Sequence, residues 1–328
     1  MSSKRFRVGV VGAGNIASIA QLPTLTTRED VELRALVDLV EDPGPKVRRW
    51  GFQNFYRSVE EMVAAEELDA AFILTPRSEH AHQTRVALEA GLDVFSEKPL
   101  ATSTADAQAL ADLAAQRDRI LMVGLNRRFA PVYATAREAF AESGATFCVA
   151  QKNRHGSEYR ATFENAIHMV DLMRWFCGGE PVEVTAHAAG DDVWEEDGVT
   201  AMVRFDNGNT GVLMAARNAG VWDERLDAYG AGVTAKVVAP DSVTIARAGG
   251  TTVREMTPEE FGWATATRSF GFAAAVHHFL DRVEDRQQPL TSGLEGAKTQ
   301  ALLDQILTAA GLPTQEQPGR VWTSHAKK

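Results

Sequence analysis

The sequence has little cysteine and no long apolar run, and both shortages narrow the classes of protein it can encode. Its 328 residues include only two cysteines, Cys148 and Cys177, too few for a disulfide framework or a cysteine-based zinc site. We therefore expect a reduced protein of the cytoplasm. No apolar run approaches the length that crosses a bilayer. The basic start MSSKRFR leads into a glycine-interrupted segment, which favours a strand over a signal peptide.

The sequence also has fewer basic residues (34 Lys and Arg) than acidic ones (44 Asp and Glu). The formal net charge is -10, which argues against nucleic acid or an anionic membrane as a partner, because either would need a basic face. A small molecule is the partner we expect.

Internal repeats and low-complexity tracts are absent as well. Hydrophobic residues make up 45% of the chain and charged residues 24%, as in ordinary globular proteins, and the length favours two domains.

The first third of the chain alternates short apolar runs with helical patterns. Such an alternation predicts βαβ units and a parallel sheet with right-handed crossovers. We expect strands within residues 5–12, 31–38, 68–76, 91–99 and 119–126, and helices within 58–67, 79–91 and 103–118. Gly91 is suited to follow one helix, and Ser103 or Thr104 to cap the next. These elements define a dinucleotide-binding domain over residues 1–124.

The remaining residues, 125–328, have a different pattern. Short strand-like segments with turn residues between them predict an α+β domain on an open, largely antiparallel sheet. Asn207-Gly208 marks the tip of a hairpin. Helical patterns cover residues 164–176, 270–285 and 294–311. We assign this domain to substrate binding and oligomerisation.

The stretch VGVVGAGNIA, residues 8–17, has the features of a phosphate-binding turn. Gly12 permits a tight turn, Gly14 lets backbone approach a diphosphate, and Ala17 keeps the following helix near the sheet. Asp38 ends the second expected strand about 20 positions further on, where a carboxylate binds the adenosine ribose. Asp38 would repel a 2′-phosphate, and no basic residue follows it directly, so we predict NAD rather than NADP. The alternative is a ligand-free βα turn.

Several motifs resemble the glucose-fructose oxidoreductase/inositol dehydrogenase (Gfo/Idh/MocA) family. They are GAGNIASIAQLPTL at residues 12–25, SEKPLA at 96–101, VGLNRRFAP at 123–131, AIHMVDLMRWFCGG at 166–179 and RLDAYGAGVTAKV at 225–237. The resemblance spans nearly the whole chain. It implies a Rossmann domain followed by a domain whose open sheet supports dimers or tetramers. It also implies NAD(P)-dependent oxidation or reduction of a CHOH group in a sugar, sugar acid or cyclitol.

The resemblance carries particular roles onto this chain. Lys98 would lie beside the nicotinamide and the substrate, before a cis peptide bond to Pro99, and His168 would be the catalytic histidine. The position of Lys98 just past a strand of an α/β sheet independently favours a ligand contact, although a lysine in a surface turn is the alternative. The cofactor-binding residues that we predict are Gly12, Gly14, Asn15, Ile16, Asp38, Thr75, Pro76, His80, Glu97 and Lys98.

The second site departs from the family pattern. Glu164 and Ala166 stand where the family usually has Asp and Gly, and Glu164 is our third catalytic candidate. Glu164, His168, Asp171 and Trp175 lie on one helical face. That face is either a substrate-facing stripe or part of a packed core in which His168 binds Asp171. We predict no metal here, since matching ligands are missing.

Basic residues upstream of this helix are candidates for an anionic group on the substrate, or else form a solvated loop. They are Lys152, Arg154, His155 and Arg160. The substrate-binding residues that we predict are Lys98, Asn126, Lys152, Arg154, Asn165 and His168. Two other functions stay open: an enzyme that oxidises and re-reduces its sugar without net NADH, and a cofactor-binding regulator without catalysis. The presence of both Lys98 and His168 argues against the regulator.

Overall fold

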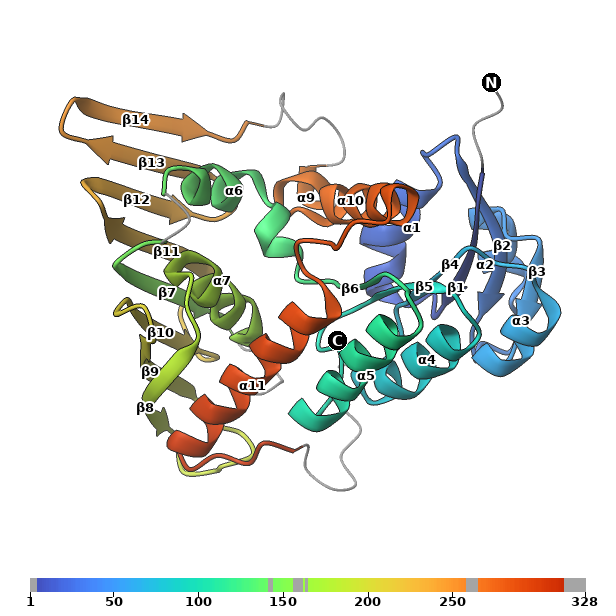
Figure 1. Cartoon of the computed structure of the whole chain (residues 1–328), viewed down its shortest axis with the longest axis horizontal. Helices are drawn as coiled ribbons and strands as arrows, with labels where there is room; N and C mark the ends of the chain where they lie inside the picture. Colours follow the sequence, from blue (N-terminus) through green and yellow to red (C-terminus); the bar gives the residue numbers. More distant parts are fainter. Residues whose placement is uncertain (1–4, 141–143, 156–161, 163–164, 258–264, 316–328) are drawn as a thin grey trace. The chain divides into compact units, whose positions relative to one another are not determined.

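The chain folds into two compact units, each built on its own sheet (Figure 1). A computed structural model describes residues 5–140, 144–155, 162, 165–257 and 265–315. The first unit comprises Met1–Asn126 and Gly271–Lys298, and the second comprises Arg127–Phe270 and Thr299–Lys328. The α/β fold class predicted from the sequence is confirmed. The sequence assigns everything after residue 124 to one domain, whereas residues 271–298 pack with the first unit.

The first unit contains a six-stranded sheet whose described strand pairs are all parallel. Its strand order, β3-β2-β1-β4-β5-β6, is that of a dinucleotide-binding Rossmann fold. The strands are β1 (Phe6–Val11), β2 (Val31–Val37), β3 (Asn54–Tyr56), β4 (Ala70–Ile73), β5 (Asp93–Ser96) and β6 (Leu121–Val123). The helices are the π-helix η1 (Ala17–Gln21), α1 (Leu22–Leu25), α2 (Gly44–Trp50), α3 (Val59–Ala65), α4 (Arg77–Glu89), α5 (Thr104–Gln116) and α10 (Phe272–Asp285).

Helices cover both faces of this sheet. Helices α4 and α5 lie on one side, and α1 lies with α10 on the other (Figure 1). Phe279 of α10 is fully buried against Phe72 and Phe95 of the sheet, with ring centroids 5.3 Å and 5.8 Å away. Burial of these aromatic rings accounts for the packing of residues 271–298 with the first unit, although α10 lies far from β4 in sequence.

The second unit contains an eight-stranded sheet in the order β14-β13-β12-β11-β7-β10-β9-β8. All described pairs are antiparallel except β7 with β10, which is parallel. The strands are β7 (Phe147–Asn153), β8 (Pro181–Ala189), β9 (Gly198–Phe205), β10 (Thr210–Ala216), β11 (Asp223–Gly230), β12 (Val233–Val238), β13 (Ser242–Arg247) and β14 (Gly250–Glu255). The helices are the 3-10 helix η2 (Asn126–Phe129), which begins at the last residue of the first unit, α6 (Pro131–Glu138), α7 (Ile167–Cys177), α9 (Thr265–Ser269) and α11 (Gly293–Ala309), which also begins in the first unit.

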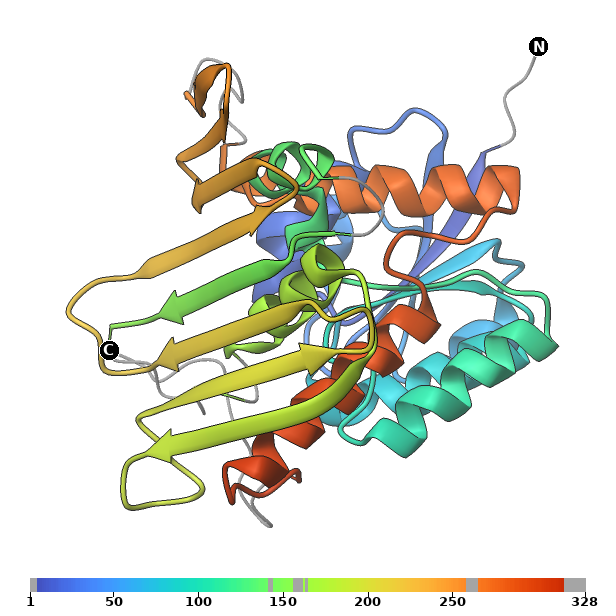
Figure 2. The same ribbon diagram turned by 60° about the vertical axis from the view of Figure 1, so that its left-hand side comes forward.

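One face of this second sheet carries the core of the unit. Helices α6 and α7 pack on it, and buried side chains alternate with exposed ones along β9 and β10. The strands lie side by side with their other face toward the viewer in Figure 2. On that face Met202 and Val212 are paired across β9 and β10 and remain exposed. Apolar side chains therefore occupy both faces of the sheet.

The local predictions are largely confirmed. Each predicted strand of the first third is present, Gly91 follows α4 with a φ of 83°, and Ser103 accepts a hydrogen bond from the Asp106 amide as the cap of α5. The hairpin at Asn207-Gly208 joins β9 to β10. The sequence misses β3, which is three residues long and owes its strand conformation to pairing with β2.

Replacing Phe279 with alanine tests the assignment of α10 to the first unit. Loss of this buried ring should lower the free energy of unfolding by about 3–5 kcal/mol. The change is measured from the denaturant midpoint of the first unit's unfolding transition. Glu284→Ala removes an exposed side chain on the same helix and should change that free energy by less than about 0.5 kcal/mol. Equal effects of the two substitutions would contradict the packing described.

Candidate functional site

The carboxyl ends of the parallel strands form one edge in exact hydrogen-bond register. Val11 pairs with Val37 and Ile73, Ile73 with Ser96, and Ser96 with Val123. The ladder continues one residue further, because the amides of Gly12, Leu74, Glu97 and Gly124 donate to neighbouring strand carbonyls at 2.8–2.9 Å. The residues just past each strand therefore form a row, and ligands of open α/β sheets bind at such an edge.

The glycine turn leaves room for a ligand at this edge. Gly12 has a φ of +88°, and a Cβ there would lie 2.8 Å from Thr75 Cγ2, so only glycine fits. A Cβ on Gly14 would meet nothing within 4 Å. Gly14 and Asn15 are exposed, and Ile16 is partly exposed. An open glycine backbone is what close approach of a diphosphate requires, so these residues fit a dinucleotide.

Asp38 closes the turn from the end of β2. Its Oδ2 accepts from the Ala13 amide at 3.1 Å and from Lys46 Nζ at 2.7 Å, while Oδ1 accepts from the Val40 amide at 3.0 Å. Partial burial works to raise the pKa of Asp38, but Lys46 and the two amides outweigh it and hold the pKa below its usual value. The carboxylate is therefore ionised and fixed beside the turn.

Glu97 is a buried acid in the same row. Its carboxylate accepts from the side-chain amide of Gln21 and, at 3.2 Å, from the backbone amide of Lys98. A Cβ on Gly124 would lie 3.1 Å from Glu97 Oε2, so glycine makes space for this carboxylate. Burial raises the pKa of Glu97 to about 7, against the opposing effects of Lys98 and Gln21. Glu97 can thus exchange a proton near neutral pH.

His80 connects the two loops that follow β4 and β5. Its Nδ1 lies 2.7 Å from the Pro99 carbonyl oxygen, and its Nε2 lies 2.8 Å from that of Thr75. The Lys98-Pro99 peptide bond is cis, as the family resemblance implies. Burial lowers the pKa of His80. The ring thus positions Thr75 and the Lys98 loop, while Pro76 is exposed and Lys98 is partly exposed.

A buried ionic cluster organises the second unit. Glu224 of β11 accepts two hydrogen bonds from Arg127, at 2.6 Å and 3.1 Å, and one from Tyr133 at 3.0 Å. Lys152 Nζ lies 3.1 Å from Glu224 Oε2. Burial alone would raise the pKa of Glu224, but Arg127 and Lys152 hold it far below its usual range. Lys152, which we predict to bind the substrate, thus forms an ion pair with Glu224.

Helix α7 buries His168 and Asp171. Asp171 is bound by Arg128 at 2.7 Å and by the Thr299 hydroxyl at 3.0 Å. Asn165 donates to the Lys152 carbonyl at 3.1 Å, and its Oδ1 is a buried acceptor without a hydrogen-bond partner in the described chain. Glu164, our third catalytic candidate, lies outside the described residues, as does Arg160.

The predicted site residues thus fall into two groups. In the first unit, the sheet edge brings together Gly12, Asp38, Thr75, Glu97 and Lys98, and Asn126 is buried after β6. In the second unit, Lys152 and Asn165 are in contact, and Arg154 follows β7 with its side chain partly buried. Burial and the nearby charge of Arg127 lower the pKa of Arg154.

Several residues whose side chains contact predicted site residues are not among the predictions: Gln21, Lys46, Gln83 and Glu224, together with Arg127, which pairs with Glu224. Arg127 belongs to the quoted stretch VGLNRRFAP, which is the one signal that could have drawn attention to it. Gln21 and Glu224 contact partners far away in the chain. The prediction of NAD rests on the residues directly after Asp38, whereas Lys46 lies eight residues further along the chain.

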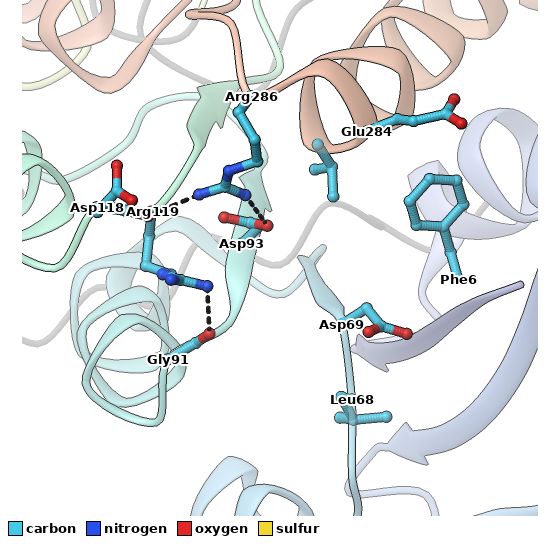
Figure 3. Close-up of a pocket in the computed structure, with 10 residues that line it drawn as sticks. Phe6, Leu68, Asp69, Gly91, Asp93, Asp118, Arg119, Glu284 and Arg286 are labelled. Atoms are coloured by element: carbon cyan, nitrogen blue, oxygen red, sulfur yellow. Dashed lines mark hydrogen bonds and ion pairs between the residues drawn. The ribbon is translucent and has the colours of Figure 1, made fainter. Parts of the chain in front are cut away.

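The first unit also has a cavity of about 400 Å³ that is separate from this edge (Figure 3). Phe6, Asp69 and Asp93 line it from the amino ends of β1, β4 and β5. Arg286 donates to Asp93 Oδ2 and to the Asp118 carbonyl, each at 2.6 Å. Since the strands are parallel, the cavity lies at the opposite edge of the sheet from Gly12 and Glu97.

Two features are absent from the residues that the structure describes. Within them, no three His, Cys, Asp or Glu side chains are grouped in a way that could hold a metal ion. No helix among them combines the length and apolar character needed to traverse a membrane.

The raised pKa of Glu97 predicts a pH dependence of stability. Between the ordinary value of 4.5 and about 7, the folded state holds a proton that the unfolded chain has lost. The free energy of unfolding should therefore fall as pH rises through this interval. Denaturant midpoints measured from pH 4 to 8 should show a smaller fall for Glu97→Gln than for the unmodified chain. Glu89→Gln, which alters an exposed carboxyl on α4, should retain the original fall; a profile unchanged by Glu97→Gln would contradict a titrating Glu97.

Solved structures share this fold. UDP-N-acetylglucosamine 3-dehydrogenase from Acidithiobacillus ferrooxidans superposes with a TM-score of 0.82 at 22% identity, covering 93% of this chain and 97% of that one. Scyllo-inositol dehydrogenase from Lactobacillus casei, solved with NAD(H) and scyllo-inositol, gives a TM-score of 0.77 at 21% identity, with 93% and 97% covered.

Sequence comparison identifies the family. Inositol 2-dehydrogenase of Rhizobium meliloti is 26% identical over 319 residues, which cover 91% of this chain and 94% of that protein. The model of the oxidoreductase family with an NAD-binding Rossmann fold matches residues 6–125. The model of the GFO/IDH/MocA C-terminal domain matches residues 149–236. Together the two models cover more than half of the sequence, and the chain belongs to the Gfo/Idh/MocA family of oxidoreductases.

Proposed function

We propose that this protein is an NAD-dependent dehydrogenase that acts on a CHOH group of a sugar, sugar acid or cyclitol. The observation that carries the proposal is the row at the sheet edge, where the open glycine turn, Asp38 and the Lys98 loop follow strands in one register. Relatives named as inositol and glucoside dehydrogenases support the substrate class.

The bound nicotinamide would supply the hydride acceptor for the substrate carbon. In this proposal, Lys98 donates a hydrogen bond to the reacting oxygen and stabilises negative charge on it. His168 accepts the hydroxyl proton as general base. Glu164 orients the imidazole or a neighbouring hydroxyl. His80 keeps the Lys98 loop in place through its contact with the Pro99 carbonyl.

We favour NAD over NADP because of Asp38. Its ionised carboxylate can accept from a ribose hydroxyl but repels a 2′-phosphate. The hydrogen bonds from Ala13 and Val40 support this proposal, since they fix the carboxylate beside the turn. Reaction in the cytoplasm accords with Cys148 and Cys177 being free thiols.

The polar residues of the second unit are our proposed substrate contacts. Asn165 offers a buried carbonyl oxygen without a partner in the described chain, which suits a substrate hydroxyl. Arg154 and Lys152 lie at the same end of β7. Asn126 completes the set from the first unit.

Lys98→Met tests the catalytic assignment. Hydride transfer should fall by about 10²–10⁴-fold, because the reacting oxygen loses its hydrogen-bond donor, while NAD still binds. Nicotinamide absorbance would be followed over a panel of sugars, sugar acids and cyclitols with NAD or NADP. His168→Asn should cause a comparable loss that depends on pH. Retained turnover in Lys98→Met would refute the assignment. A silent panel despite NAD binding would favour the enzyme without net NADH or the cofactor-binding regulator.

We also propose that the chain forms homodimers or homotetramers through the uncovered face of the second sheet. Phe147 and Met202 are each 55% exposed there, and Val212 pairs with both Met202 and Val149 across the strands. A continuous apolar strip on three adjacent strands is typical of an interface between protein chains. A second copy of the same sheet can cover it.

A double substitution, Met202→Glu with Val212→Glu, tests the interface. Two charges in the strip should convert the oligomer to monomers in sedimentation velocity, because their desolvation is unfavourable. Val193→Glu adds charge to an exposed loop of the same unit and should leave the oligomer intact. Monomers in the unmodified protein, or an oligomer that survives the double substitution, would rule out this interface.

A further inference from the structure

We propose that Lys46 determines how strongly the protein discriminates between NAD and NADP, and that it admits NADP as a second, weaker ligand. The inference rests on the cofactor site proposed above. Lys46 lies on α2, outside the glycine turn, and the dinucleotide-binding motif does not include it.

Lys46 already uses one hydrogen-bond acceptor position of Asp38, the carboxylate that we propose binds the ribose. Its ammonium lies 2.7 Å from Asp38 Oδ2, which also accepts from the Ala13 amide, and Oδ1 accepts from the Val40 amide. A carboxylate offers about four lone-pair positions. Three are in use, so Asp38 can bind one ribose hydroxyl with Lys46 in place, and a second only if Lys46 withdraws.

Lys46 also changes the charge that a 2′-phosphate would meet. Asp38 alone presents a negative charge, but the ion pair with Lys46 is neutral overall and offers further ammonium hydrogens as donors. The Lys46 side chain is 33% exposed, whereas that of Asp38 is 15% exposed. The lysine can therefore turn outward to a phosphate while the carboxylate stays fixed by the two backbone amides.

The loop between β2 and α2 joins the two members of this pair, and an arginine holds its backbone in place. Arg57 donates to the carbonyl oxygens of Val40 and Glu41, so its guanidinium braces the loop backbone. Asp42 accepts from the Gly44 amide at the start of α2. Glu41 and Asp42 are exposed acids on this loop, and Lys46 is the cation in direct contact with the Asp38 carboxylate.

The inference can be tested without a known substrate. The full chain is titrated with NAD and with NADP, and each Kd is measured by isothermal titration calorimetry. The unmodified protein should bind both, with NAD more tightly. Lys46→Met should raise the Kd for NADP about tenfold, because the 2′-phosphate then faces Asp38 without a countercharge. The Kd for NAD should change less than threefold. Lys46→Arg should restore NADP binding.

The matched control is Arg49→Met, which makes the same change of charge on helix α2. Arg49 lies over the Trp50 ring at 4.7 Å, and its loss should leave both Kd values within twofold. Raising ionic strength should favour NADP binding more for Lys46→Met than for the unmodified protein, because the uncompensated repulsion from Asp38 is screened.

The outcomes separate the inference from the proposed function. Binding of neither dinucleotide by the unmodified protein would overturn both. Binding of NAD with no detectable NADP, or equal effects of Lys46→Met on the two ligands, would overturn the role of Lys46 and leave the dehydrogenase intact. A circular dichroism melt of Lys46→Met that matches the unmodified protein ensures that the comparison concerns binding.

Discussion

The hydrogen-bond register of the parallel sheet is the constraint on which the candidate cofactor site depends. Because β1 pairs with both β2 and β4, and β4 with β5, the last residues of these strands lie in one row. The next residues then leave the sheet together. A slip of one position in any strand would send Asp38 or Glu97 to the wrong place, since successive side chains of a strand point to opposite faces.

Burial gives the acids of this edge different properties. Asp38 is held by two amides and a lysine, which stabilise its ionised form. Glu97 has an amide donor and the backbone of Lys98, and it is buried more deeply, so its proton is retained to about pH 7. Two carboxylates in one row thus differ in charge near neutrality because their surroundings differ.

The second unit buries charged side chains beside its mostly antiparallel sheet. Glu224 would be strongly unfavourable if it were alone, and it is matched by Arg127, Lys152 and the Tyr133 hydroxyl. These groups come from a 3-10 helix, two strands and α6. Such a network is stable only as a whole, since removing one charge leaves the others buried and unmatched.

The sequence by itself determined most strands of the first unit and the sheet edge where the candidate cofactor site lies, and it did so through local spacing. The strand, glycine turn and Asp38 follow one another within a single βαβ unit, so periodicity and turn residues were enough to place them. Only the tertiary structure decided which side chains meet across the chain. Gln21 reaches Glu97 across 76 positions, and Arg127 reaches Glu224 across 97. No local pattern records these pairs, because they arise from how packed elements bring distant residues together.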